Sequence, residues 1–182
     1  HSKGKWLSGA IWVACPFFCI LWDVNKFQII SSNSPLLSIQ CVKLSNELFG
    51  LNYHNFNFFN NQSKIKLLAI DKNKVVGFLI AEKIKSNQIE IQSIGIENDW
   101  QNKSVGTALM KKLMDKFNKK NTNIITKAWK YKNVIYVKKL IEKFGLKPLI
   151  NKGKVWKEKC NILFKCKYYK KQCKCECIVF SN

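Results

Sequence analysis

The chain has 182 residues, of which 47% are hydrophobic and 13% aromatic, so it is long enough and apolar enough to fold as one domain around a buried core. This composition excludes an intrinsically disordered protein. The net charge is +21, and all 32 basic residues are lysine. Because the sequence has no arginine, bidentate recognition of guanine or phosphate is excluded, and phosphates would have to be held by backbone amides and lysine.

The positive charge has two interpretations. A strongly basic surface attracts nucleic acid and acidic substrates. The lysines are spread evenly along the chain, however, and this spread together with the lack of arginine favours the codon bias of a lysine-rich genome. Nucleic acid is therefore a partner that the charge permits but that we do not favour.

The first 26 residues form an apolar extension. Residues 10–22 are an apolar run that follows Lys3 and Lys5, but they have no small-residue cleavage site and are shorter than the roughly 20 apolar residues that span a bilayer. We interpret this run as a packing segment, or as translated sequence ahead of the true start, rather than as a signal or anchor. We therefore expect a cytoplasmic protein without a membrane partner.

The next elements are a helix and three strands. Residues 35–49 predict a helix that begins with proline. Residues 65–70 and 75–84 predict a β-hairpin, and residues 88–96 predict a third strand that alternates polar and apolar at first. Residues 52–61 are rich in asparagine and predict a polar loop, in which His54 is isolated and does not look catalytic.

A polar loop follows the third strand and leads into an amphipathic helix. The backbone amides of residues 101–106 can converge there, and the helix dipole also favours negative charge. Gly106 would adopt a positive φ or let a ligand approach the backbone, and Ser104 would add a hydroxyl donor. The loop therefore predicts a phosphate site, although short polar loops between a strand and a helix are also common without any ligand.

Further along the chain, residues 123–128 read as a buried strand. Asn133 is predicted to begin a helix that runs to Phe144 and is ended by Gly145, and residues 146–149 form a short strand. In this position Asn133 reads as an ordinary helix N-cap.

The spacing of Gln101, Ser104 and Gly106 resembles the acyl-CoA loop of the GNAT acetyltransferase superfamily, whose pattern is Gln or Arg, two residues, Gly, one residue, and Gly or Ala. Ser104 stands where the family usually has glycine, and we expect it to fit in a first-turn helix conformation. The order of elements over residues 27–150 also resembles this family. The resemblance implies an α/β fold with a mixed, mostly antiparallel sheet, flanking helices and a splayed strand pair at the acetyl-CoA site.

The resemblance also implies which residues bind acetyl-CoA. Amides near Ile94 and Ile96 would pair with the pantetheine arm, an asparagine near the later helix would touch it, and the loop would hold the pyrophosphate. The predicted cofactor-binding residues are Ile94, Gly95, Ile96, Gln101, Asn102, Lys103, Ser104, Val105, Gly106, Thr107 and Asn133.

Catalysis would be direct attack of an amine on the thioester, and it needs few side chains. Glu90 and Glu97 flank the third strand, so either would act as base or relay, or be a solvated carboxylate. Ile141 occupies the place where the family's tyrosine acts as general acid, and Tyr136 lies nearer the helix start. The catalytic candidates are therefore Glu90, Glu97 and Tyr136.

The C-terminal segment, residues 151–182, is rich in lysine and cysteine, and it either completes the sheet or is appended to it. Clustered cysteines in a domain of this size indicate metal or redox chemistry rather than a disulfide scaffold. The predicted metal ligands are Cys160, Cys166, Cys173, Cys175 and Cys177. In an extended strand the first and last of the final three would lie about 13 Å apart, so a zinc site needs a turn or a choice among them, and free thiols are the alternative.

The sequence thus predicts a cytoplasmic, acetyl-CoA-dependent N-acetyltransferase whose amine acceptor is unidentified. The alternative is a GNAT-like scaffold without catalysis, or a basic nucleic-acid-binding module. Ile141, Ser104 and the thiol-rich C-terminal segment are the features that favour this alternative.

Overall fold

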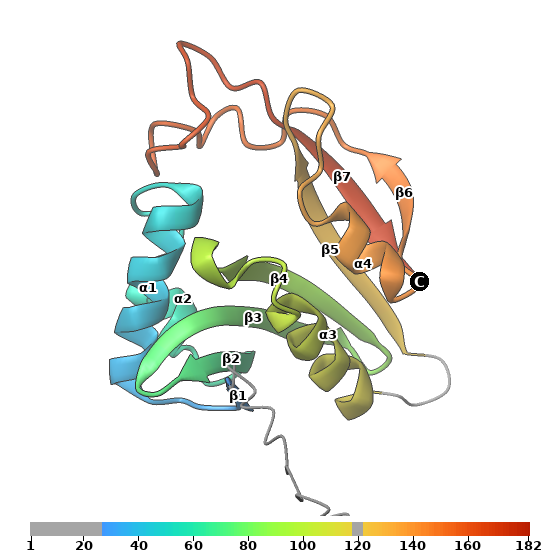
Figure 1. Cartoon of the computed structure of the whole chain (residues 1–182). Helices are drawn as coiled ribbons and strands as arrows, with labels where there is room; N and C mark the ends of the chain where they lie inside the picture. Colours follow the sequence, from blue (N-terminus) through green and yellow to red (C-terminus); the bar gives the residue numbers. More distant parts are fainter. Residues whose placement is uncertain (1–26, 118–121) are drawn as a thin grey trace, which may run out of the picture.

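The computed structural model describes residues 27–117 and 122–182, so the expectations for the apolar extension lie outside the described residues. Seven strands form one sheet in the order β1-β2-β3-β4-β5-β7-β6 (Figure 1). The strands are β1 (Gln28–Ile30), β2 (Ile65–Asp71), β3 (Lys74–Lys85), β4 (Gln88–Ile96), β5 (Asn123–Lys130), β6 (Lys147–Asn151) and β7 (Glu176–Ser181). The helices are α1 (Pro35–Phe49), α2 (Phe56–Asn60), α3 (Val105–Lys116) and α4 (Lys138–Lys143), with a short 3₁₀ helix η1 (Asn98–Trp100).

The strand pairing changes from antiparallel to parallel at the centre of the sheet. Strands β1 to β4 pair antiparallel in sequence order, and β7 pairs antiparallel with both β5 and β6. The central pair, β4 and β5, is parallel and stays paired only from Gln88 to Ile91 on β4. Beyond that point the two strands diverge, and Figure 1 shows the sheet opening there into two wings.

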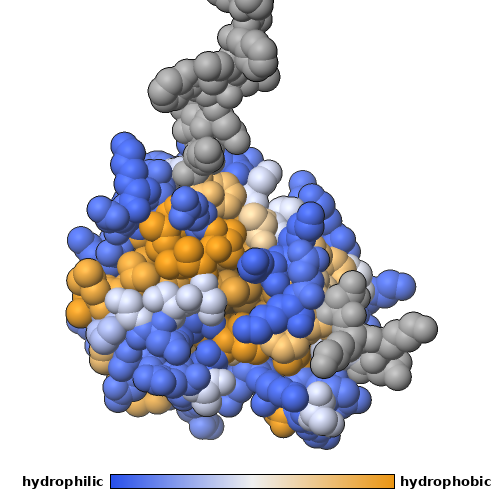
Figure 2. Space-filling model, turned by 90° about the horizontal axis from the view of Figure 1, so that it is seen from below, coloured by the Kyte–Doolittle hydropathy of each residue, from blue (hydrophilic) through white to orange (hydrophobic). Residues whose placement is uncertain are grey.

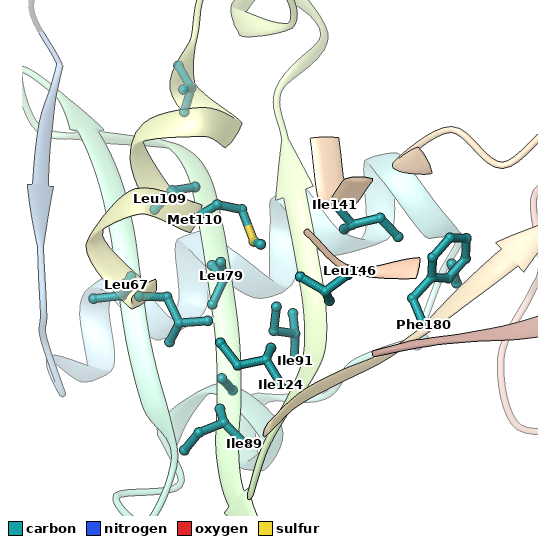
Figure 3. Packing of buried hydrophobic residues seen from close by; sticks show 14 of the residues in the cluster. Leu67, Leu79, Ile89, Ile91, Leu109, Met110, Ile124, Ile141, Leu146 and Phe180 are labelled. Carbon is teal, nitrogen blue, oxygen red and sulfur yellow. The ribbon is translucent and has the colours of Figure 1, made fainter. Parts of the chain in front are cut away.

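Helices cover both faces of the sheet and bury two apolar clusters. Helices α3 and α4 pack with β2 to β5 and β7 in the larger cluster, in which Leu109, Met110, Ile141 and Phe180 are no more than 2% exposed (Figure 3). Helices α1 and α2 cover the opposite face through Leu44 and other apolar residues. Burial of these side chains, at about 25 cal/mol per Å² of apolar surface, is the main force that holds the layers together.

Several sequence predictions are confirmed. The mixed, mostly antiparallel sheet with a splayed central pair is present, and α1 and β4 have the predicted bounds. Both segments carry strong local signals, since α1 begins with Pro35 as its first helical residue and β4 alternates buried and half-buried positions.

Two predictions about elements were wrong. The helix predicted to begin at Asn133 begins at Lys138, because Lys132 and Asn133 both have positive φ and form a tight turn closed by hydrogen bonds between Tyr131 and Val134. The polar loop at 52–61 contains α2, whose N-cap Asn55 accepts a hydrogen bond from the Phe58 amide at 2.9 Å.

Candidate active site

A cleft lies between the splayed strands. Its volume is about 680 Å³, and its walls come from the second half of β4, the loop before α3, β5, α4, the end of α1 and the segment before β7. Because β4 and β5 have separated, each strand presents an edge to this space that has no neighbouring strand.

A β-bulge sets which backbone groups of β4 face the cleft. Ser93 pairs with Ile80 of β3, whereas Ile91 pairs with Ala81, so Gln92 is an extra residue without a partner on β3. A bulge shifts the alternation of a strand by one residue and re-aims the groups that follow it.

Two hydrogen bonds show which way the backbone groups of β4 point after the bulge. The Glu97 amide donates to the Val76 carbonyl of β3 at 2.9 Å, and the Gln101 side chain donates to the Ile96 carbonyl, which points the other way, at 3.1 Å. Since backbone groups alternate along a strand, the N–H groups of Ile94 and Ile96 point away from β3, into the cleft. They are free to bind an extended ligand as an added strand would.

The loop before α3 presents a second set of free donors. No hydrogen bond joins the amides of Val105, Gly106 or Thr107 to any acceptor in the described part of the chain, whereas the Ala108 amide already donates to the Ser104 carbonyl at 2.9 Å. All three residues line the cleft. Free amides at the positive end of a helix dipole bind phosphate well, so the arrangement at this end of the cleft suits an anion.

The conformation of this loop differs from the prediction. Ser104 does not adopt a first-turn helix conformation but sits at the N-cap with φ 62° and ψ 5°, in the left-handed region, and Asn102 also has a positive φ of 61°. Gly106 is helical and does not have a positive φ. Its missing Cβ matters for packing instead, because a Cβ there would lie 3.0 Å from Cδ2 of Leu140 on α4.

All charged side chains that line the cleft are lysines. Lys127 is paired with Glu90 at 2.7 Å, while Lys139, Lys143 and Lys167 have no ion pair with any described residue. Lys139 and Lys143 are one turn apart on α4, beside Leu140, which contacts the start of α3. They add positive charge next to the free amides, and the sequence analysis did not single them out.

The predicted site residues divide between the cleft and its surroundings. The cleft is lined by the predicted residues Ile94, Gly95, Ile96, Gln101, Asn102, Ser104, Val105, Gly106, Thr107 and Tyr136. Lys103, Asn133, Glu90 and Glu97 are not among its lining residues. Lys103 lies over the Trp100 ring, Asn133 is exposed in its turn, and Glu97 pairs with Lys74. Ile141 is buried in the core.

Aromatic residues form the wall opposite the anion site. The Tyr136 ring stacks on that of Tyr168 with centroids 6.2 Å apart. Burial, and next the neighbouring Tyr136 phenol, raises the pKa of Tyr168 to about 12. Burial also raises the pKa of Tyr53, which packs edge-on against Trp129 at 4.9 Å. Both phenols therefore stay protonated at neutral pH and are available as proton donors.

The segment between β6 and β7 closes this end of the cleft. It crosses from the β6–β7 wing to the end of α1 (Figure 1), where the Lys165 amide donates to the Leu51 carbonyl at 2.8 Å. The segment thereby carries Lys167 and Tyr168 to the rim of the cleft. Sequence analysis missed both residues, because only this crossing, and no local pattern, brings them there.

No cysteine of the described residues lines the cleft. None of the predicted metal ligands lines it, and no three or more His, Cys, Asp or Glu side chains within residues 27–117 and 122–182 are set out as a metal site. No helix in the described ranges is both long enough and apolar enough to span a bilayer.

A family model described as the acetyltransferase (GNAT) family matches residues 36–146, which is more than half of the chain. The chain belongs to the GNAT acetyltransferase family. Members of this family are acyl-CoA N-acetyltransferases, and the matched residues include both the splayed strands and the loop before α3. No curated protein matches the sequence.

Solved structures share the fold at low sequence identity. A GNAT acetyltransferase from Desulfovibrio desulfuricans is similar with a TM-score of 0.67 and 6% identity, covering 86% of this chain and 98% of its own. An aminoglycoside 6'-N-acetyltransferase complexed with coenzyme A has a TM-score of 0.67 and 15% identity, covering 85% and 96%. The ribosomal-protein-S18-alanine N-acetyltransferase of Escherichia coli has a TM-score of 0.66 and 13% identity, covering 86% and 92%. At these identities the likeness concerns the GNAT fold alone.

Proposed function

We propose that this GNAT protein transfers an acetyl group from acetyl-CoA to the primary amine of a neutral or anionic acceptor. The proposal rests on two sets of free backbone N–H donors that face the same cleft. One set is the first-turn amides of α3, and the other is the edge amides of Ile94 and Ile96. A diphosphate and an amide-containing arm are the two parts of coenzyme A that these donors fit.

The chain's own residues would hold the nucleotide at one end of the cleft. The diphosphate would accept hydrogen bonds from the amides of Val105, Gly106 and Thr107 and from the Ser104 hydroxyl, which makes no hydrogen bond to any described residue. Lys139 and Lys143 would compensate its charge without arginine. Acetyl-CoA supplies a thioester carbonyl that is already activated, so positioning the two reactants is the main task left to the protein.

Proton transfer would use the phenols at the other end of the cleft. Tyr136 and Tyr168 both line it, and each carries a phenol hydroxyl that can donate a proton to the departing thiolate. Glu90 and Glu97 do not line the cleft, and each is paired with a lysine. We therefore propose that the acceptor amine arrives neutral or loses its proton through water.

Charge around the cleft indicates the class of acceptor. No Asp or Glu is among its lining residues, whereas Lys167 stands on the rim beside Phe49, Tyr53 and Tyr168. A polycation such as an aminoglycoside or polyamine would find no carboxylate there and would meet like charge. An amine that carries an apolar group and a nearby carboxylate, such as the α-amine of an amino acid or short acidic peptide, fits this wall.

Cofactor binding is tested by calorimetry with acetyl-CoA. We expect Gly106→Glu to abolish binding, because it places bulk and negative charge among the free amides, next to Leu140. Asn87→Glu is the matched control, since it adds the same charge at an exposed turn residue outside the cleft. A folded Gly106→Glu variant with unchanged affinity would refute the proposed phosphate site.

Acceptor class is tested with a panel of amines, and acetylated products are measured by mass spectrometry because the eight cysteines of the chain would react with a thiol reagent. We expect acidic and neutral α-amines to have a higher kcat/KM than spermidine at low salt. Lys167→Glu should reverse this order, whereas Lys165→Glu, exposed but outside the cleft, should not. Equal turnover of spermidine and an acidic peptide by the wild type would contradict the proposed acceptor.

The proposed role of a tyrosine as general acid is tested with the variants Tyr136→Phe and Tyr168→Phe. Loss of a positioned proton donor should lower kcat by about 10²-fold or more and leave the affinity for acetyl-CoA unchanged. If only one phenol is the acid, only that variant should lose kcat. Unchanged kcat in both variants and in the double variant would rule out a tyrosine acid.

A further inference from the structure

The segment of residues 152–175 lies outside the α-helices and sheet strands of the described fold. Irregular segments longer than about 12–15 residues are uncommon in compact domains and usually have a function of their own. This one has a small core, in which Cys160, Cys173 and Cys175 are 4–5% exposed and pack with Phe164 and the partly buried Cys166.

The four cysteines of this core pack in one cluster. Burial raises the pKa of the Cys160 thiol, and the neighbouring thiols of Cys166 and Cys173 raise it further. Burial and the same two neighbours raise the pKa of the Cys175 thiol. Four thiols that are separated by up to 15 positions in the sequence thus lie close together.

We propose that Cys160, Cys166, Cys173 and Cys175 form a structural zinc site that holds this segment in its crossing over the cleft. Four thiolates are the ligand set that zinc takes in closed, tetrahedral sites. With Zn–S bonds of about 2.3 Å, the sulfurs of such a site lie about 3.8 Å apart, which is contact distance. Binding releases the four thiol protons, and no oxidant or reductant takes part.

The thiols must move from their present positions to bind zinc, since no three of them stand in a metal-binding arrangement within the described ranges. Because the four side chains already pack in one cluster, rotation about their Cα–Cβ bonds would turn the sulfurs toward a common centre. A cluster of buried thiols is otherwise a weak core, since a thiol is a poor hydrogen-bond donor and acceptor.

The surrounding charge favours a thiolate site. Residues 152–175 include nine lysines and one glutamate, Glu158. A zinc ion with four thiolates carries two negative charges, which the lysines compensate.

The fifth predicted ligand, Cys177, does not belong to this set. It lies within β7, opposite Trp129 of β5, and the charged neighbours of its thiol are Lys127, Lys152 and Glu90 rather than other cysteines. Cys41 is likewise buried elsewhere, on the face of α1 that packs against the sheet. Both are therefore matched controls inside the same chain.

The test is the metal content of the full chain purified under reducing conditions. We expect one zinc ion per chain by elemental analysis, and cobalt substitution should give the intense charge-transfer and d–d absorption bands of tetrahedral thiolate ligation. Cys160→Ser and Cys173→Ser should lose the metal, while Cys177→Ser and Cys41→Ser should retain it.

A variant that fails to fold does not weaken the test, because wild-type protein stripped with a chelator can be titrated with Zn²⁺ against a chromogenic competitor. Absence of zinc together with no binding in this titration would overturn the proposal. Disulfides between the same four cysteines in protein that contains no metal would also overturn it.

The functional consequence rests on the proposed transferase activity. Cys166 directly precedes Lys167 and Tyr168, so zinc removal should raise the KM for the acceptor while the affinity for acetyl-CoA stays the same. Metal content is measured without any substrate. Failure of the transferase proposal would therefore leave the zinc result intact, and the reverse also holds.

Discussion

Ser104 shows how one residue sets the shape of the anion site. Its φ of 62° lies in the left-handed region, which costs a non-glycine residue about 1 kcal/mol, and this turn leaves the next three amides free. We expect Ser104→Gly to raise the free energy of unfolding by about 0.5–1 kcal/mol. Because backbone amides make most of the phosphate contacts, the affinity for acetyl-CoA should change less than about threefold. Urea unfolding and calorimetry measure the two quantities.

Asn102→Gly is the control for this substitution. Asn102 has almost the same φ, 61°, but asparagine tolerates the left-handed region better than serine. Replacing Asn102 with glycine should therefore raise the free energy of unfolding by less than replacing Ser104 does. An equal gain at both positions, or a tenfold loss of affinity in Ser104→Gly, would contradict this account of the loop.

His54 is buried in an aromatic cluster and is not the isolated loop residue that its sequence context suggested. Its ring stacks on Phe58 with centroids 3.8 Å apart, and no described residue hydrogen-bonds to its Nε2. Burial, helped by the charge of Lys64, lowers the pKa of His54 to about 3. The folded state thus keeps His54 neutral, while the unfolded state binds a proton below its ordinary pKa of about 6.5.

His54 should therefore make the protein sensitive to acid. Its contribution to stability is fully present above about pH 6.5 and is lost as the pH falls from there toward 3, by about 2 kcal/mol at pH 5. His54→Phe keeps the aromatic packing but removes this proton, so its free energy of unfolding should fall less between pH 7 and pH 5. Parallel pH curves for the two proteins, obtained by urea unfolding, would contradict the prediction.

At the scale of elements, Gly50 joins α1 to the segment that crosses the cleft. Its φ of 112° is accessible to glycine alone, and a Cβ would lie 1.9 Å from the Lys165 carbonyl oxygen. We expect Gly50→Ala to release the segment from α1, to cost more than about 2 kcal/mol, and to lower acceptor turnover more than acetyl-CoA affinity.

Gly153→Ala separates the clash at Gly50 from backbone strain. Gly153 also has a positive φ, 68°, but nothing lies within 4 Å of its Cβ position. Its substitution should cost only about 1 kcal/mol, measured by urea unfolding. Similar losses in the two variants would mean that the contact with Lys165 is unimportant.

Local signals explain which elements could be predicted from the sequence. The polar-apolar alternation of β4 and the proline at the start of α1 act within a single segment, and both elements have the expected bounds. Asn133 was misread because asparagine favours both helix N-caps and left-handed turns, and here the preceding Lys132 shares the positive φ of a two-residue turn.

Only one side of the cleft could be predicted, namely the side that is built by one continuous segment of the sequence. The loop and β4 residues are close in sequence, so the spacing of Gln101, Ser104 and Gly106 was sufficient to find them. Lys139, Lys167 and Tyr168 reach the cleft through α4 packing on α3 and through the crossing segment. Such long-range placement leaves no periodic pattern in the sequence.

For the whole molecule, a net charge of +21 acts on stability and on ligand binding in opposite directions. The described residues form only four lysine–carboxylate pairs, so most of the 32 lysines repel one another. The face seen in Figure 2 carries hydrophilic side chains around a central apolar area. Self-repulsion of this kind destabilises the compact state.

Salt should therefore stabilise the fold and weaken cofactor binding in the same experiment. The Debye length falls from about 30 Å at 0.01 M to about 10 Å at 0.1 M ionic strength, which screens repulsion among lysines and attraction for the phosphates of acetyl-CoA alike. We expect the thermal midpoint to rise by several degrees over this range while the Kd for acetyl-CoA increases. Sodium and potassium chloride should act equally, and sucrose should leave the Kd unchanged. A midpoint that falls with salt would show that the four ion pairs outweigh the repulsion of the unpaired lysines.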